Sequence, residues 1–87
     1  MNDFGEQYHA AQHAIATLKS LVREVVSNAP DGGLRNSEIG RTLGNYSGHV
    51  EHEGHISRTL LEMLKAEGVV QQNPVNKAWT LRNHFER

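Results

Sequence analysis

Three histidines spaced three residues apart are the side chains whose types come closest to a metal site. His49, His52 and His55 alternate with two carboxylates, Glu51 and Glu53. Imidazole and carboxylate groups are both ligands of zinc, and this spacing allows chelation from a loop or a first helical turn. A ligating histidine normally has an outer partner that orients its ring, and the sequence indicates none. We therefore interpret these residues as polar loop residues and predict no metal site.

No residue pattern in the sequence is typical of catalysis. Ser57 follows His55 by two positions, and side chains two apart on a helix do not face each other. The absence of cysteine excludes catalytic thiols, thiolate metal sites and disulfides. His9 and His13 have chelating spacing, but a lone pair four residues apart is more typical of exposed helix surface. We predict no enzymatic activity and no cofactor.

The clearest binding surface is the start of a helix predicted over residues 53–67. Its apolar residues recur at helical spacing and should pack into a core: Ile56, Leu60, Leu61 and Leu64. His55, Arg58 and Thr59 lie off this stripe and should face outward. Gly68 is the left-handed residue expected just after a helix end. The helix would then present a short polar face near its N-terminus, where N–H groups attract phosphate.

A long helix is predicted over residues 3–29. Asp3 and Glu6 resemble a capping box at its start, and Pro30 ends it. Apolar residues alternate at spacings of three and four, as in a heptad stripe: Tyr8, Ala11, Ile15, Leu18, Val22, Val25 and Ala29. We expect the second half to pack in the core and the first half to be a solvated extension. Alternatively, residues 4–15 pack against a second copy.

A short strand and a short helix should follow. Leu34 and Arg35 form the candidate strand. Asn36 or Ser37 is expected to cap the helix, which would stop at Gly44.

The C-terminal part predicts a β-hairpin. Residues 69–72 and 78–82 are two short strand-like segments joined by a turn that contains Pro74. Trp79 and Leu81 alternate with polar neighbours, so they should cover the core.

The order helix, short strand, helix, helix, hairpin resembles the winged-helix domain of bacterial winged helix-turn-helix DNA-binding proteins. The residues that carry the resemblance are those of 33–44, 56–64 and 67–70. It implies an α+β fold, a winged helix with three helices plus a C-terminal β-hairpin wing, here with a long N-terminal helix. The chain would be a single domain over residues 1–87, with a core at about 15–82, a helical extension at 1–14 and a tail at 83–87.

The resemblance also implies a contact face for duplex DNA, with the third helix in the major groove and the hairpin tip near the flanking backbone. The implied DNA-binding residues are Tyr46, Ser47, His52, His55, Ser57, Arg58, Thr59, Asn76 and Lys77. Arg35 and Arg41 are weaker candidates for phosphate contacts. The alternative for this face is a solvated polar surface with Arg58 paired to Glu62. The chain departs from the compact motif between Gly44 and Ile56, which are about six residues further apart than the resemblance implies.

The charge balance opposes broad attraction to DNA. Nine Lys and Arg face ten Asp and Glu, which gives a net charge of −1 with histidine neutral. A DNA-binding domain is usually basic, so any contact must come from local placement of cations. Mild acid would add charge, because histidine has a reference pKa of about 6.5. Near-neutral charge also favours the alternative function, a protein–protein interaction adaptor with the same fold.

The N-terminus has no basic and apolar segments of a signal peptide, and no apolar run approaches membrane-spanning length. We therefore expect a soluble cytoplasmic protein. It would be a transcription regulator or the DNA-targeting part of a larger DNA-processing assembly. Dimerisation through the N-terminal helix is a second hypothesis.

Overall fold

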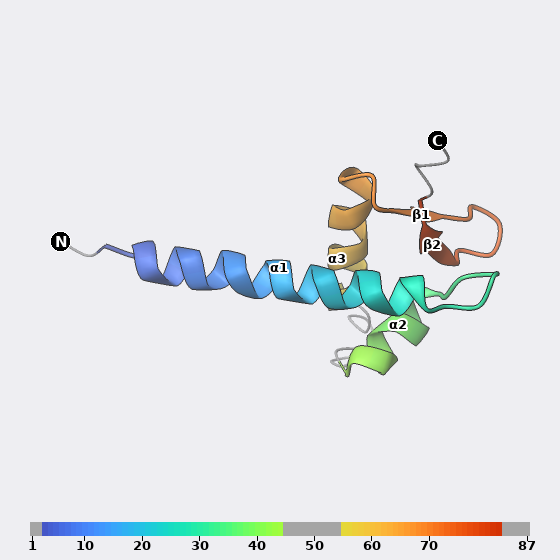
Figure 1. Ribbon diagram of the computed structural model, residues 1–87, viewed down its shortest axis with the longest axis horizontal. Coiled ribbons are helices and arrows are strands. Elements are labelled where there is room, and N and C mark those ends of the chain that lie inside the picture. The colour runs from blue at the N-terminus through green and yellow to red at the C-terminus, as the bar shows by residue number, and fades with distance from the viewer. Residues whose placement is uncertain (1–2, 45–54, 83–87) are drawn as a thin grey trace.

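The computed structural model describes residues 3–44 and 55–82, which form three helices followed by a two-stranded antiparallel sheet (Figure 1). The elements are α1 (Gly5–Ser27), α2 (Asn36–Leu43), α3 (His55–Ala66), β1 (Val70–Gln72) and β2 (Trp79–Leu81). The prediction of an α+β chain with three helices and a C-terminal hairpin is confirmed. No helix in these two ranges is both long and apolar enough to cross a membrane.

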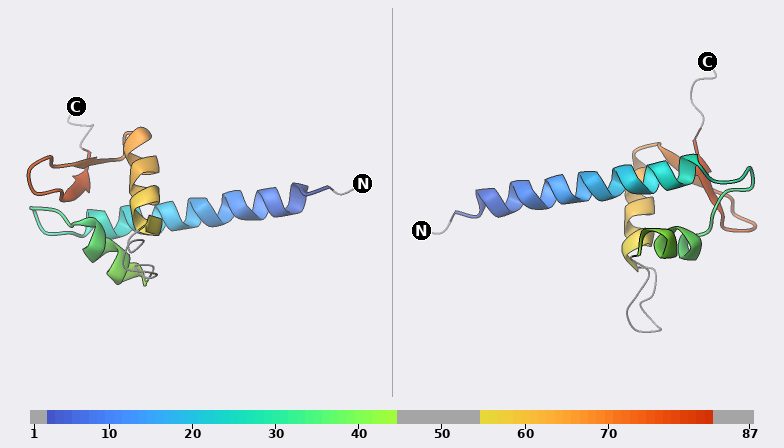
Figure 2. Two further views of the ribbon diagram at one scale, coloured as in Figure 1. Left: turned by 180° about the vertical axis from the view of Figure 1, so that it is seen from behind. Right: turned by 60° about the horizontal axis from the view of Figure 1, so that its bottom comes forward.

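The core lies where the C-terminal half of α1 meets α2, α3 and the hairpin. Its buried hydrophobic residues are Val22, Val26, Ile39, Leu60, Leu61, Leu64, Val70 and Trp79. The N-terminal half of α1 extends away from the other described elements, as both views of Figure 2 show. The molecule therefore measures 51 Å along its longest axis and 19 Å along its shortest. The prediction that the second half of this helix enters the core is confirmed.

The ends of α1 lie within two residues of the predicted bounds. The helix begins at Gly5, and the Asp3 side chain accepts a hydrogen bond from the Gly5 N–H at 3.0 Å. At the other end the Asn28 N–H donates to the carbonyls of Glu24 and Val25. Pro30 follows, and its missing N–H prevents a further helical turn.

The first turn of α3 differs from the prediction. Ile56 is half-exposed, at 50% of its full accessible surface, whereas Ser57 is completely buried. The expectation that Ile56 begins the buried stripe is wrong. The inward positions are Ser57, Leu60, Leu61 and Leu64, which follow the i, i+3, i+4, i+7 spacing of one helix face. The three leucines face inward as predicted, and their helical spacing places Ser57 at the centre of the same face and Ile56 at its edge.

A hydrogen bond between α2 and α3 accounts for the buried hydroxyl of Ser57. The Ser57 hydroxyl donates to Oδ1 of Asn36 at 2.6 Å, so the buried hydroxyl is satisfied. The prediction that Asn36 or Ser37 caps α2 is wrong, because Arg35 occupies the cap position. The Arg35 N–H donates to Oε1 of Glu38 at 2.8 Å. Asn36 is thus used to connect two helices.

The hairpin is held against the loop after α1. Val70 pairs with Leu81 and Gln72 with Trp79. Leu34 adds a single antiparallel bridge to Trp79, with N–O distances of 3.1 and 2.6 Å. The predicted strand is therefore one residue long.

Gly33, next to this bridge, has φ of +84°, and a Cβ there would lie 2.4 Å from the Trp79 carbonyl oxygen. Only glycine fits at this close approach. Gly68 has φ of +79° after α3, as expected.

Candidate nucleic-acid interface

A polar hollow of about 300 Å³ lies where α2, α3 and the hairpin meet. Three cationic side chains and three neutral polar ones line it: Arg35, Arg58, Lys77, Asn36, Ser37 and Gln72. We call this site the cationic hollow. Its residues are far apart in the sequence, and the packing of three elements brings them together.

Each cation is positioned by a different element. Arg35 is the cap residue of α2, and Arg58 lies in the first turn of α3. The Ser57–Asn36 hydrogen bond joins these two helices at the residues next to both arginines. Lys77 lies in the turn between the strands, in the left-handed region with φ of +66°.

The turn that carries Lys77 is braced by side-chain hydrogen bonds. Oδ1 of Asn73 accepts from the Val75 N–H at 2.8 Å, and Oδ1 of Asn76 accepts from the Ala78 N–H at 2.9 Å. The Gln72 amide donates to the Lys77 carbonyl at 3.0 Å. These bonds hold the turn in one shape, so Lys77 extends from a defined position.

Among the described residues no acid lines the cationic hollow. Arg35, Arg58 and Lys77 are exposed, and none forms an ion pair with a residue of the described ranges. The alternative pairing of Arg58 with Glu62 is therefore not present. The nearby Glu38 carboxylate accepts the Arg35 N–H and offsets the partial positive charge of the α2 N-terminus. A chain of net charge −1 thus presents a local concentration of positive charge suited to an anionic partner.

Apart from Ser57, the predicted contact residues divide into four groups. Arg58 and Lys77 line the cationic hollow, whereas His55 and Thr59 are exposed on a different groove. Asn76 lines a separate hollow on the hairpin with Asp31. Those outside the described residues are Tyr46, Ser47 and His52.

Ser57 requires a correction. The expectation that it belongs to an exposed contact face is wrong, because it is fully buried and bonded to Asn36. Its hydrogen bond to Asn36 connects α3 to α2.

Two residues of the cationic hollow have weak sequence signals. Gln72 is not among the predicted contact residues, because the sequence does not indicate which way a polar side chain at a strand end faces. The sequence makes Arg35 only a weaker candidate for phosphate contact, because its position depends on the pairing of Leu34 with Trp79. These two residues are 45 positions apart in the sequence. The sequence signal that favours Arg35 is its position after a glycine turn and immediately before a helix.

A second groove lies on the other side of α3. It has a volume of about 310 Å³ and is lined almost entirely by apolar surface, from Ile15, His55, Ile56, Thr59, Leu60 and Met63. We call it the apolar groove. It shares no lining residue with the cationic hollow.

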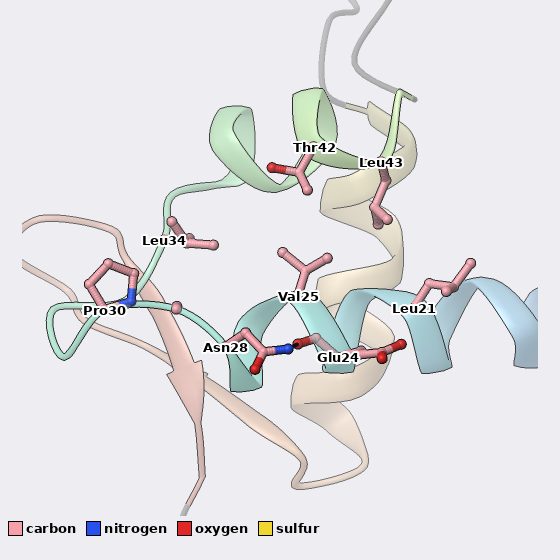
Figure 3. Close-up of a pocket in the computed structure, with 9 residues that line it drawn as sticks. Leu21, Glu24, Val25, Asn28, Pro30, Leu34, Thr42 and Leu43 are labelled. Atoms are coloured by element: carbon pink, nitrogen blue, oxygen red, sulfur yellow. Dashed lines mark hydrogen bonds between the residues drawn. The ribbon is translucent and has the colours of Figure 1, made fainter.

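A third hollow, of about 430 Å³, separates the C-terminal half of α1 from α2 (Figure 3). Leu21, Val25, Leu34 and Leu43 form its apolar walls, and Glu24 is its one ionisable lining residue. The Glu24 carbonyl is engaged by the Ser27 hydroxyl and the Asn28 amide. A single carboxyl group without an acid or base partner indicates no proton-transfer chemistry here.

The candidate metal ligands fall largely outside the structure. His49, His52, Glu51 and Glu53 all lie outside the described residues. Within residues 3–44 and 55–82, no group of three or more His, Asp or Glu is placed to hold a metal ion.

Comparison of the chain with protein-family models, with curated proteins and with solved structures finds no match.

Proposed function

We propose that the chain is a duplex DNA-binding module with a winged-helix fold. The single observation that supports this most is the cationic hollow, where Arg35, Arg58 and Lys77 converge without an ion-pairing carboxylate among the described residues. In a winged helix, the third helix, the start of the second and the hairpin tip are the parts that approach DNA. These are the elements that carry the three cations.

The three cations would have different roles. α3 would enter the major groove with Arg58 directed at base edges, where an arginine reads guanine through two hydrogen bonds. Arg35 at the start of α2 and Lys77 on the hairpin would contact phosphates on either side. The module would serve as a transcription regulator or as the DNA-targeting part of a larger assembly.

The alternative is a protein-interaction adaptor with the same fold. A net charge of −1 favours it, because the charge supplies little long-range attraction to DNA. Salt separates the two functions. Three phosphate-neutralising cations predict that the logarithm of the DNA affinity falls with the logarithm of salt concentration at a slope of roughly −3. An adaptor shows no duplex binding even at low salt.

The decisive experiment is selection from a random duplex library at low salt, followed by affinity measurement on the enriched sequence. We expect Arg58→Ala to weaken binding roughly 10- to 100-fold and to relax the preference at one base pair, because a base contact is lost.

Arg23→Ala is the matched control. Arg23 is an exposed arginine of α1 that lines a different hollow, beside Glu67, so its removal should leave the preference unchanged. An equal loss in both variants would indicate only general charge attraction. No enrichment with the wild-type chain would reject DNA binding.

A further inference from the structure

We propose that two copies of this chain form an antiparallel dimer through the protruding half of α1. In this dimer Tyr8 of each copy enters the apolar groove of the other, against Ile15, Ile56 and Met63. The inference concerns a different surface from the cationic hollow and does not depend on DNA binding. It specifies which part of the chain fills which groove, and so goes beyond self-association.

The first observation is a stripe on α1 that continues past the core. Tyr8, Ala11 and Ile15 lie on the same helix face as the buried Val22, since seven residues make nearly two turns. At the core end Val22 is completely buried, whereas Tyr8 is 62% exposed. The preceding Phe4 is also 63% exposed. A face that is buried along half of its length and apolar along the other half indicates a partner for the exposed half.

The second observation is the apolar groove. Its lining residues belong to α1 and α3, and these two helices cross each other (Figure 1). Ile56 stands on its wall with half of its surface exposed. Aromatic and large aliphatic side chains of this kind are typical anchors and pockets of protein interfaces. Phe4, Tyr8 and Ile56 are three of the five exposed large hydrophobic residues in the described chain.

The occupant that we propose for the apolar groove is a second copy of the chain, because a two-fold axis fills both grooves in the same way. α1 is one straight helix, so its own Tyr8 cannot turn back into the groove beside Ile15 (Figures 1 and 2). A two-fold rotation that places a second α1 antiparallel along the first directs its N-terminal end at α3. Both grooves are then filled by the same contact, which gives a closed, self-complementary interface.

The composition of the protruding half suits a helix–helix contact. Between residues 5 and 18, Glu6 is the one residue among Asp, Glu, Lys and Arg. It lies nine positions from Ile15 and therefore on the opposite side of the helix. Ala11 lies on the stripe near the centre of the overlap, and its small side chain allows two helices to approach closely. The proposed interface therefore buries no charge.

The test measures the mass of the full chain in solution by light scattering over a concentration series. We expect the mass of two 9.7 kDa chains. Tyr8→Glu and Ile56→Lys should each raise the dimer Kd at least about 100-fold, because each places an unpaired charge in an apolar contact. Ala10→Glu, on the outer side of the same helix, should leave the mass unchanged.

Mixing the two charged variants distinguishes this geometry from simple pairing of two α1 helices. A heterodimer of the Tyr8→Glu and Ile56→Lys chains contains one native Tyr8–Ile56 contact and one Glu–Lys contact. Equimolar mixing should therefore restore the dimer mass that each variant loses alone. A wild-type mass of one chain at every concentration overturns the proposal. So does a dimer that survives Ile56→Lys, or a mixture that remains monomeric.

Discussion

The two sides of the first turn of α3 differ sharply in chemistry although they are formed by residues two apart. Ile56 stands on the wall of the apolar groove, and Arg58 lines the cationic hollow. Between them Ser57 points inward and is completely buried. Consecutive helix residues are separated by about 100°, so the choice of the inward residue fixes both neighbours at once. The orientation of one helix therefore creates both surfaces.

Ile56 stays half-exposed because the three leucines of α3 set the orientation of the helix. An inward Ile56 would bury more apolar surface than Ser57 does, and burial of a whole isoleucine is worth roughly 2 kcal/mol. Leu60, Leu61 and Leu64 face inward together, however, and their spacing places Ser57 at the centre of that face and Ile56 at its edge. The bond from Ser57 to Asn36 then satisfies the buried hydroxyl.

The two surfaces also depend on different parts of the fold. The cationic hollow needs the hairpin, which is held by the bridge from Leu34 to Trp79. The apolar groove needs only α1 and α3, and an ion pair joins Lys19 of α1 to Glu67, the residue after α3. Substitutions should therefore damage one surface and leave the other intact.

The largest effect is expected from Gly33→Ala. The added Cβ would lie 2.4 Å from the Trp79 carbonyl oxygen, at a backbone φ of +84°. We expect the free energy of unfolding to fall by roughly 3 kcal/mol, since strain and a broken bridge act together. The hairpin would shift, so DNA affinity should fall further than stability alone explains, while the proposed dimer persists. Urea unfolding and light scattering measure the two effects.

Gly32→Ala is the matched control for this prediction. A Cβ at Gly32 meets no atom within 4 Å, and its φ is not positive. The substitution should be neutral or slightly stabilising. Equal losses at both glycines would show that the close approach to Trp79 is not what fixes the hairpin.

A smaller effect is expected from Ser57→Ala. The change removes the bond to Asn36 and leaves a partly buried amide oxygen with one partner fewer. We expect the free energy of unfolding to fall by about 1–2 kcal/mol. DNA affinity should also decrease, because α2 and α3 carry Arg35 and Arg58. Thr42→Ala is the control, since the exposed Thr42 hydroxyl bonds only within α2, to the Glu38 carbonyl. A smaller loss for Ser57→Ala than for Thr42→Ala would contradict this role of Ser57.

Sequence patterns predicted the elements more accurately than the contacts between them. Helical periodicity located α1 and α3, and the apolar run around Trp79 located the hairpin, because these signals arise within one segment. The contact between α2 and α3 was not predictable in the same way. It includes the bond from Ser57 to Asn36, whose partners are 21 residues apart.

The candidate site shows the same division. Arg58 and Lys77 were identified from the helix and turn that carry them, and both line the cationic hollow. Ser57 was misassigned, since its polarity was given more weight than its helical spacing from the three leucines. His55 and Thr59 were placed on the same face as Arg58. Both are exposed as expected, but they line the apolar groove and not the cationic hollow.

The smallest effect is expected at Lys77, where stability and binding should change in opposite directions. Lysine has a Cβ and holds φ of +66°, a conformation that glycine adopts without steric cost. Lys77→Gly should therefore raise the free energy of unfolding by up to about 1 kcal/mol. Removing the cation should reduce the magnitude of the salt slope of DNA binding by about one. Lys77→Ala separates the two causes, because it removes the same charge and keeps the Cβ. Both variants should show the same salt slope, and only the glycine variant should gain stability. Unchanged slopes in both would remove Lys77 from the interface and leave Arg35 and Arg58 as its cations.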